Sequence, residues 1–145
     1  MNYHSLDKFS KLSNIVLSII AACSLVVGLI SYLHNSDLQK LAMTNQIFSE
    51  YSKSCLKYPQ YANGLDSVLA KDPKQNEEYY NFADLALYSG ETILLLNESD
   101  SAWIGTVQDI IKDHKDYILS GTFPMKHYSD EMNALIKSTL KEKNN

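Results

Sequence analysis

The most constraining feature of this sequence is an uninterrupted apolar segment near its N-terminus, from Ile15 to Leu33. Its 19 residues, IVLSIIAACSLVVGLISYL, include no charged side chain, and no Asp, Glu or Lys occurs between Lys11 and Asp37. At ~1.5 Å per residue, a helix of this length extends just under ~30 Å, the thickness of the hydrocarbon core of a bilayer. We therefore predict a transmembrane helix at residues 14–34, preceded by an N-terminal tail of residues 1–13 and followed by a polar domain of residues 35–145.

Two other interpretations of the apolar segment are weaker. A cleavable signal peptide has a shorter apolar core and a cleavage site made of small residues, and the following SYLHNSD offers no such site. The tetrapeptide Ile20-Ala21-Ala22-Cys23 resembles the lipobox of a bacterial lipoprotein. A lipid-modified cysteine is usually followed by polar residues, whereas Leu25 to Leu33 remains apolar. An uncleaved anchor is favoured, and lipoprotein processing at Cys23 stays open.

The lysines that flank the segment leave its orientation open. Lys8 and Lys11 precede the apolar segment closely, and Lys40 and Lys53 follow at a greater distance. Basic residues near a membrane helix favour the cytoplasmic side, so this arrangement weakly favours an internal N-terminus and an external domain.

Small residues recur along one side of the predicted membrane helix. Ala21, Ser24, Gly28 and Ser31 follow one another at steps of three, four and three residues. Such stripes allow membrane helices to approach closely, and Ser24 and Gly28 form a small-xxx-small pair. The pattern predicts a self-association face, although small residues are also common in membrane helices that do not associate.

The composition from residue 37 onward restricts the partners of the predicted domain. This part has 11 Lys, no Arg and 16 acidic residues, a net charge of −5. This composition disfavours duplex nucleic acid as a partner, because phosphate binding depends on clustered Lys and Arg. Cys23 lies in the predicted membrane helix and Cys55 in the domain, so the sequence predicts no internal disulfide.

The domain is predicted to be all-α, a four-helix, bundle-like arrangement. The first helix continues from the membrane helix or begins at Asn35 to Asp37, and it ends before Tyr58-Pro59. Its apolar stripe is either a coiled-coil seam or one face of a bundle helix. A loop containing Asn63-Gly64 and Asp72-Pro73 follows, then helices from Asn76 to Leu96, from Asp100 or Ser101 to Gly121, and from Ser129 onward.

Candidate binding residues cluster around the predicted loop. Tyrosine rings can stack on a nucleotide base and lysines can neutralise phosphate, and both types occur here with an asparagine: Lys53, Lys57, Tyr58, Tyr61 and Asn63. Lys126 and His127 form a second candidate for anion contact. Structural tyrosines at helix ends and solvated lysines would explain the same residues.

No catalytic, metal-binding or cofactor motif is visible. The sequence contains no H-E-x-x-H, no Walker loop and no G-x-S-x-G. His114, between Asp113 and Lys115, is a candidate base, but it falls on an apolar helix face with Trp103 and Tyr117 and is more typical of a core histidine. We expect no cofactor and no enzymatic activity.

Two resemblances add to this interpretation. The segments YYNFADLALYSGETILLL, SAWIGTVQDIIKDHKDYILSGTF and KHYSDEMNALI resemble those of a broad group of bacterial membrane-anchored helical proteins of unknown function. The shared features are Glu91 in a central helix, Trp103 at the start of the next helix and Tyr128 before the last helix. The layout is also similar to that of small CRISPR-associated membrane effectors that respond to cyclic tetra-adenylate, although no ligand-contact motif matches residue by residue.

The second resemblance implies a specific function. Members of that family combine a membrane helix with a cytosolic ligand domain, assemble as tetramers and perturb the membrane when activated. The sequence is therefore expected to encode a homo-oligomeric effector of the bacterial inner membrane that binds a small signal, such as a cyclic oligoadenylate, in antiviral defence. The alternative is a non-enzymatic single-pass subunit that docks on a larger membrane complex.

Overall fold

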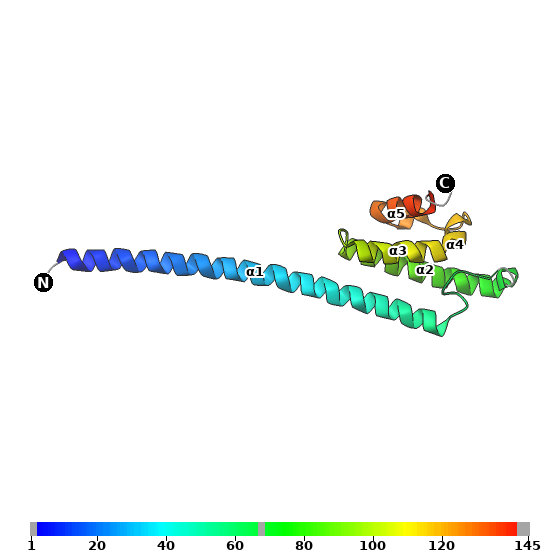
Figure 1. Cartoon of the computed structure of the whole chain (residues 1–145), viewed down its shortest axis with the longest axis horizontal. Helices are drawn as coiled ribbons and strands as arrows, with labels where there is room; N and C mark the ends of the chain where they lie inside the picture. The colour runs from blue at the N-terminus through cyan, green and yellow to red at the C-terminus, as the bar shows by residue number, and fades with distance from the viewer. Residues whose placement is uncertain (1–2, 67–68, 142–145) are drawn as a thin grey trace. The chain divides into compact units, whose positions relative to one another are not determined.

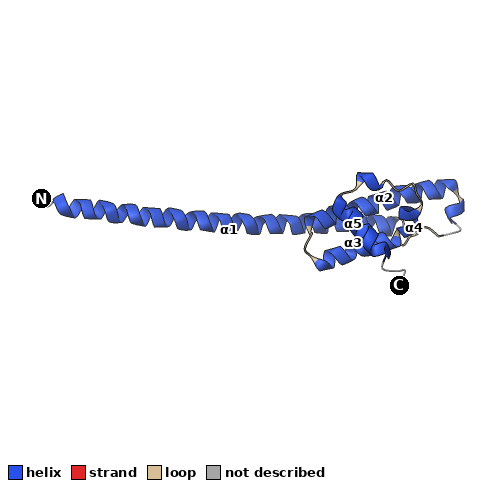
Figure 2. Ribbon diagram, turned by 90° about the horizontal axis from the view of Figure 1, so that it is seen from above, coloured by secondary structure: helices blue, strands red, loops and turns tan. Residues whose placement is uncertain are grey.

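The computed structural model describes residues 3–66 and 69–141, and every regular element in these ranges is helical (Figures 1 and 2). The five α-helices are α1 (Tyr3–Lys57), α2 (Pro73–Leu96), α3 (Ser101–Asp113), α4 (Lys115–Leu119) and α5 (Asp130–Lys141). Two short 3₁₀ helices, η1 (Leu69–Lys71) and η2 (Met125–His127), lie in the connections. The predicted all-α class is confirmed. Residues 1–2 of the predicted tail, and residues 67–68 and 142–145 of the predicted domain, lie outside the described ranges.

The chain divides into two compact units, Met1–Gln39 and Lys40–Asn145. The predicted boundary between residues 34 and 35 falls five residues before this division. Helix α1 continues through Asn35 to Asp37 without interruption, so these residues do not cap a new helix. The helix ends at Lys57 because Tyr58 precedes Pro59, and the residue before a proline disfavours the helical conformation.

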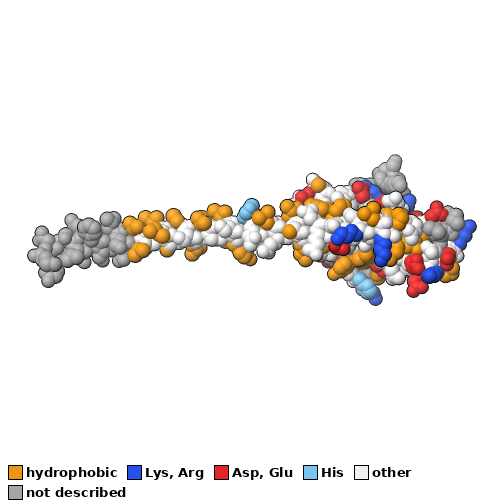
Figure 3. Space-filling view, turned by 90° about the horizontal axis from the view of Figure 1, so that it is seen from below, with side chains coloured by type: hydrophobic (Ala, Val, Ile, Leu, Met, Phe, Trp, Pro, Cys, Tyr) orange, Lys and Arg blue, Asp and Glu red, His pale blue; other side chains and the backbone are white. Residues whose placement is uncertain are grey.

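In the first unit, α1 carries apolar side chains around its whole circumference. Leu25 is 74% exposed and Val27 62% exposed, and no residue of the most apolar part of the helix is buried by the chain. Figure 3 shows this part of the surface as hydrophobic side chains without Lys, Arg, Asp or Glu. In the part of the chain that the structure describes, α1 is the one helix long and apolar enough to cross a membrane.

Helix α2 begins earlier than the sequence predicted. The side chain of Asp72 accepts a hydrogen bond from the backbone N–H of Lys74 at 3.0 Å, and Pro73 occupies the first helical position. The sequence analysis placed Asp72-Pro73 in the loop before the helix. Proline is, however, favoured at the first position of a helix, because the N–H that it lacks would have no helical partner there. The predicted start at Asn76 is therefore three residues too late.

The predicted third helix is divided into α3 and α4. Asp100 caps α3 through the backbone N–H groups of Ala102 and Trp103, as the sequence suggested. The helix stops at Asp113, although neither glycine nor proline occurs between Gly105 and Gly121. His114 at the break is fully buried, so tertiary packing accounts for the interruption better than helix propensity.

The core of the second unit is centred on α2. Small residues on α2 allow α3 to approach closely: a Cβ added at Gly90 would lie 3.4 Å from Cγ1 of Val107. Helix α5 contributes Met132 and Ile136 to the same core, and both side chains are almost fully buried. Helices α2, α3 and α5 thus lie side by side and pack directly against one another (Figure 2).

The second-unit part of α1 packs through longer side chains. The rings of Phe48 on α1 and Trp103 on α3 meet edge to face, with centroids 5.6 Å apart. The side-chain amide of Asn97 donates a hydrogen bond to the fully buried hydroxyl of Thr44 at 2.8 Å. Because these contacts are made by long side chains, the distance between α1 and α2 is greater than the distance between α3 and α2. Hollows therefore remain between α1 and α2.

Candidate functional site

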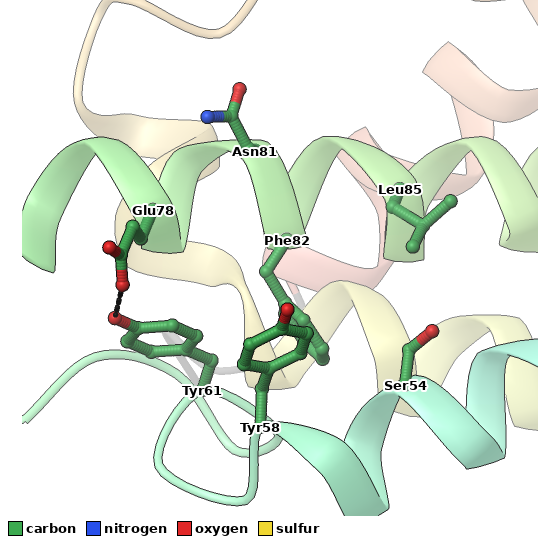
Figure 4. Close-up of a pocket in the computed structure, with 7 residues that line it drawn as sticks. All are labelled: Ser54, Tyr58, Tyr61, Glu78, Asn81, Phe82 and Leu85. Carbon is green, nitrogen blue, oxygen red and sulfur yellow. Dashed lines mark hydrogen bonds between the residues drawn. The ribbon is translucent and has the colours of Figure 1, made fainter.

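One of these hollows lies between the C-terminal end of α1 and the N-terminal half of α2, and we call it the tyrosine groove. Its volume is ≈ 410 Å³. The residues that line it come from three segments, α1, the loop that follows it and α2: Ser54, Tyr58, Tyr61, Glu78, Asn81, Phe82 and Leu85. Figure 4 shows Tyr58, Tyr61 and Phe82 turned toward one another, with the amide of Asn81 pointing away from the rings.

The helical repeat explains the α2 side of the groove. Four of the lining residues belong to α2: Glu78, Asn81, Phe82 and Leu85. The last three follow Glu78 by three, four and seven residues, so all four share one face of the helix. Phe82 turns inward and is buried, whereas Leu85 is 48% exposed. The four residues were not predicted as site residues, because the exposure of Leu85 and its approach to Tyr58 depend on how α2 packs beside α1.

Tyr61 forms a fixed wall of the groove. It is 1% exposed, and its hydroxyl lies 2.6 Å from Oε1 of Gln75 and 3.1 Å from Oε2 of Glu78. Burial raises the pKa of Tyr61, and the hydrogen bond to Glu78 raises this pKa further, so the phenol remains a neutral donor. A residue held in this way shapes the groove and does not present its ring to solvent.

Tyr58 is the accessible aromatic residue of the groove. Its ring is stacked on Tyr61 with centroids 6.3 Å apart and meets the edge of Phe82 at 6.4 Å. The ammonium group of Lys57 lies 5.1 Å from the centre of the Tyr58 ring, a cation–π contact. Tyr58 is 37% exposed, so a ligand in the groove would contact this ring and meet a positive charge at its rim.

The structure brings only some of the predicted site residues together. Tyr58 and Tyr61 line the groove, and Lys57 adjoins it. Lys53 forms an exposed ion pair with Glu50 at 2.7 Å, and Asn63 is an exposed loop residue that does not line the groove. Lys126 and His127 are exposed residues of η2 and are also absent from the groove lining.

The charge distribution of the groove favours neutral or partly cationic groups inside it. Glu78 is the one charged residue among the seven that line it, and Lys74 lies 3.9 Å from the carboxylate of Glu78 on the solvent side. Positive charge is available only around the rim. A phosphate group would therefore be bound outside the groove rather than within it.

His114 lies behind the groove and has no access to it. Its Nδ1 is 3.3 Å from the hydroxyl of Tyr79, and its ring meets the rings of Tyr79 and Phe82 at 5.8 and 5.7 Å. Burial lowers the pKa of His114 to about 4, so the imidazole is neutral at pH 7. Its full burial supports the interpretation as a core histidine.

The groove offers hydrogen-bonding groups of several kinds. Its polar groups are a serine hydroxyl, a carboxylate, an amide and phenols, and no imidazole or thiol accompanies them. Comparison with protein-family models, with curated proteins and with solved structures finds no match to this chain.

Proposed function

We propose that this chain is a single-pass membrane protein whose bundle-like helical domain binds a small signal molecule in the tyrosine groove. Residues 14–34 would cross the bilayer. The exposed apolar side chains of this segment support that part of the proposal, because a contiguous apolar surface of this size is unfavourable in water. Lipid, or other copies of the same helix, would cover it.

The observation that carries the ligand proposal is the composition of the groove. Pockets for small molecules typically have volumes of roughly 300–1,000 Å³ and combine apolar walls with a few polar groups. The tyrosine groove, at ≈ 410 Å³, has aromatic walls from Tyr58 and Phe82 and polar groups from Ser54 and Glu78. A planar heteroaromatic group such as a purine would stack against Tyr58 and find hydrogen-bond partners at the polar groups.

Cyclic oligoadenylates are the proposed class of signal. The adenine base would occupy the groove, and the phosphates would remain outside near Lys57, because the carboxylate of Glu78 repels them from the interior. An oligomer of four copies would present one groove to each adenosine of a cyclic tetra-adenylate. The domain would then be cytosolic, opposite to the side that the flanking lysines weakly favour, and the protein would belong to the inner membrane.

Coupling to the membrane would depend on α1. This helix supplies Ser54 to the groove and also contains the apolar segment without an interruption between them. A ligand changes the arrangement of a protein only if it binds one arrangement better than another. Different packing of the membrane helices along Ala21, Ser24, Gly28 and Ser31 would be the response, and a perturbed membrane would be the output in antiviral defence.

The test uses the full chain in detergent or nanodiscs with a panel of cyclic oligoadenylates, read by native mass spectrometry. We expect a discrete homo-oligomer that binds the cyclic ligand. Tyr58→Ala should weaken ligand binding by at least about tenfold, the effect expected for one lost aromatic stacking contact. Ser54→Leu should weaken ligand binding to a similar extent, because the larger side chain fills the groove. Lys126→Ala, a change of an exposed residue outside the groove, is the matched control. Failure of the wild-type protein to bind any member of the panel would refute the ligand proposal.

A second candidate function is that of a docking subunit in a larger membrane complex. The exposure of Leu85, Tyr88 and Leu95 along α2 favours it, because such a surface is typical of a protein interface. A protein of this kind would bind no member of the panel and would co-purify with other proteins at fixed stoichiometry.

A further inference from the structure

We propose that the exposed face of α2 binds the same face of α2 in a second copy of this chain. The surface concerned, which we call the α2 ridge, follows a spacing of three, four and three residues and consists of Leu85, Tyr88, Thr92 and Leu95. This inference goes beyond the ligand site, because the ridge lies outside the tyrosine groove except for Leu85 and its association requires no ligand.

The exposure of the ridge is the first observation. Leu85 is 48% exposed, Tyr88 65% and Leu95 44%. The spacing of the four residues is that of a heptad seam, in which side chains of one helix insert between those of a facing helix. At ~1.5 Å per residue, the ridge extends about 15 Å along α2, or nearly three turns.

The second observation is a hollow directly beside the ridge, with a volume of ≈ 320 Å³. Helix α1 supplies one wall of this hollow through Met43, Gln46, Ile47 and Glu50. The other wall consists of α2 residues, including Leu85, Tyr88 and Thr92 of the ridge itself. The same surface therefore carries both a protruding apolar ridge and a hollow that can receive one.

This combination favours a second copy as the occupant. In a two-fold symmetric interface the same patch meets itself, so each copy must present both the protruding and the receiving part. The chemistry of Tyr88 fits this arrangement. Its phenol can insert into the partner's hollow with the ring against Met43 and Ile47, and it can donate its hydroxyl hydrogen to Gln46 or Glu50 on the partner's wall.

The charge distribution favours the same conclusion. Residues 37–145 have a net charge of −5, so two copies repel each other over most of their surface. Between Leu85 and Leu96, Glu91 is the sole charged residue, and it is buried and accepts a hydrogen bond from the backbone N–H of Ser129. On the ridge itself two acidic copies can therefore meet without like charges facing each other, and the Glu50 carboxylate on the wall of the hollow is paired with Lys53 of its own chain.

Cysteine cross-linking of the full chain in membranes tests the inference. Cys23→Ser and Cys55→Ala together provide a cysteine-free background, because these are the two cysteines of the chain. Tyr88→Cys is then oxidised in the absence of ligand, and we expect a disulfide-linked dimer, since residues near a two-fold axis meet their own counterparts. The matched control is Ala134→Cys, an exposed position on α5, which should remain monomeric.

A second variant tests the role of Tyr88 without relying on its replacement by cysteine. With Leu95→Cys as the reporter and a long flexible bismaleimide in place of oxidation, Tyr88→Lys should lower the yield of cross-linked dimer by about tenfold, because two like charges would oppose each other at the centre of the interface. Tyr88 is 65% exposed, so this change leaves the core of the domain untouched.

Three results would overturn the inference. These are a Leu95→Cys variant, with Tyr88 intact, that stays monomeric with the bismaleimide, equal cross-linking at Ala134→Cys, and a cross-linked product whose mass identifies a different protein. Ligand binding is measured separately on the panel above. Dimers without ligand binding would thus refute the signal proposal alone, and ligand binding without dimers would refute the α2 interface alone.

Discussion

The carboxylate of Glu91 accepts a hydrogen bond from the backbone N–H of Ser129 at 2.5 Å and thereby joins the middle of α2 to the start of α5. Glu91 is 8% exposed, and Ser129 in turn accepts a hydrogen bond from the N–H of Met132 through its own hydroxyl. The N-terminus of α5 is thus satisfied by both a local serine and a distant glutamate. Negative charge at this end of a helix is also favoured by the helix dipole.

Replacement of Glu91 should destabilise the second unit. Glu91→Ala leaves the N–H of Ser129 without its partner in a partly buried position, which costs about 1–3 kcal/mol of unfolding free energy. Urea unfolding of the full chain, followed by fluorescence of the single tryptophan, Trp103, measures this change. Glu98→Ala, at an exposed glutamate, is the control and should have little effect. Equal stability of the two variants would show that the contact contributes nothing.

The buried His114 should make the unfolding free energy depend on pH. Its pKa is about 4 in the folded protein and 6.5 in an unfolded chain, so the unfolded state binds a proton first as the pH falls. The contribution of His114 is therefore fully present above pH 6.5, decreases as the pH falls, and is lost below about pH 4. The maximum loss is about 3 kcal/mol, from ~1.4 kcal/mol per pKa unit.

The measurement compares unfolding curves between pH 7 and pH 4 for the wild type and His114→Phe. The variant should lose most of the pH dependence of this window, whereas His127→Gln, a change of an exposed histidine, should retain it. Burial raises the pKa of Asp113, which acts in the opposite direction, so the difference between the variants is diagnostic. A His114→Phe curve parallel to that of the wild type would contradict the prediction.

Two glycines with left-handed backbone conformations should respond differently to alanine. Gly64 has a φ of 95°, and a Cβ there would lie 2.8 Å from the carbonyl oxygen of Asp113. Gly121 has a φ of 77° with no atom within 4 Å of the added Cβ. Gly121→Ala should therefore cost only the conformational strain, about 1–2 kcal/mol. Gly64→Ala should cost more by at least about 1 kcal/mol, because a clash is added. Equal melting temperatures of the two variants would contradict this difference.

Gly90 offers a test of the close approach between α2 and α3. A Cβ at this position would make an ordinary contact with Val107, so Gly90→Ala should be neutral or stabilising by up to about 1 kcal/mol through helix propensity. Gly90→Leu should instead destabilise by about 1–3 kcal/mol, because the interface has no room for the larger side chain. Thermal unfolding followed by circular dichroism distinguishes the two. Similar melting temperatures would show that the helices can separate at no cost.

Gly28 tests the proposed packing of the membrane helices. The chain itself leaves open space around it, with no atom within 4 Å of an added Cβ. Gly28→Leu should therefore abolish ligand-dependent leakage from vesicles while leaving ligand binding intact, because bulk on this face prevents close approach between helices. Ala22→Leu, on a different side of the helix, is the control. Unchanged leakage in Gly28→Leu would remove the stripe from the mechanism.

Much of the secondary structure follows from local signals. Asp100 and Ser129 cap the helices that they were predicted to begin, and the helix before Pro59 ends where the proline requires it. The errors have specific causes. Asp72-Pro73 serves both in turns and at helix starts, and the division at His114 depends on the packing of its imidazole rather than on a helix-breaking residue.

The candidate site was accessible to sequence analysis only in part. The cluster of Tyr58, Tyr61 and Lys57 was recognised because these residues are neighbours in the chain. Glu78 and Leu85 were not, since they approach Tyr58 only when α2 packs beside α1. Lys126 and His127 were included for their chemistry, and the fold does not bring them into the groove.

The sequence by itself determined which segment is apolar enough to cross a bilayer, where most helices begin and end, and that the domain is acidic. These properties depend on composition and on contacts between residues close in the chain. Only the tertiary structure decided that Tyr61 is a buried wall while Tyr58 is exposed, that His114 is sealed within the core, and that Leu85 and Tyr88 remain uncovered. The physical reason is that burial depends on which helices pack together and how closely, and small residues on α2 bring α3 near while long side chains on α1 leave hollows.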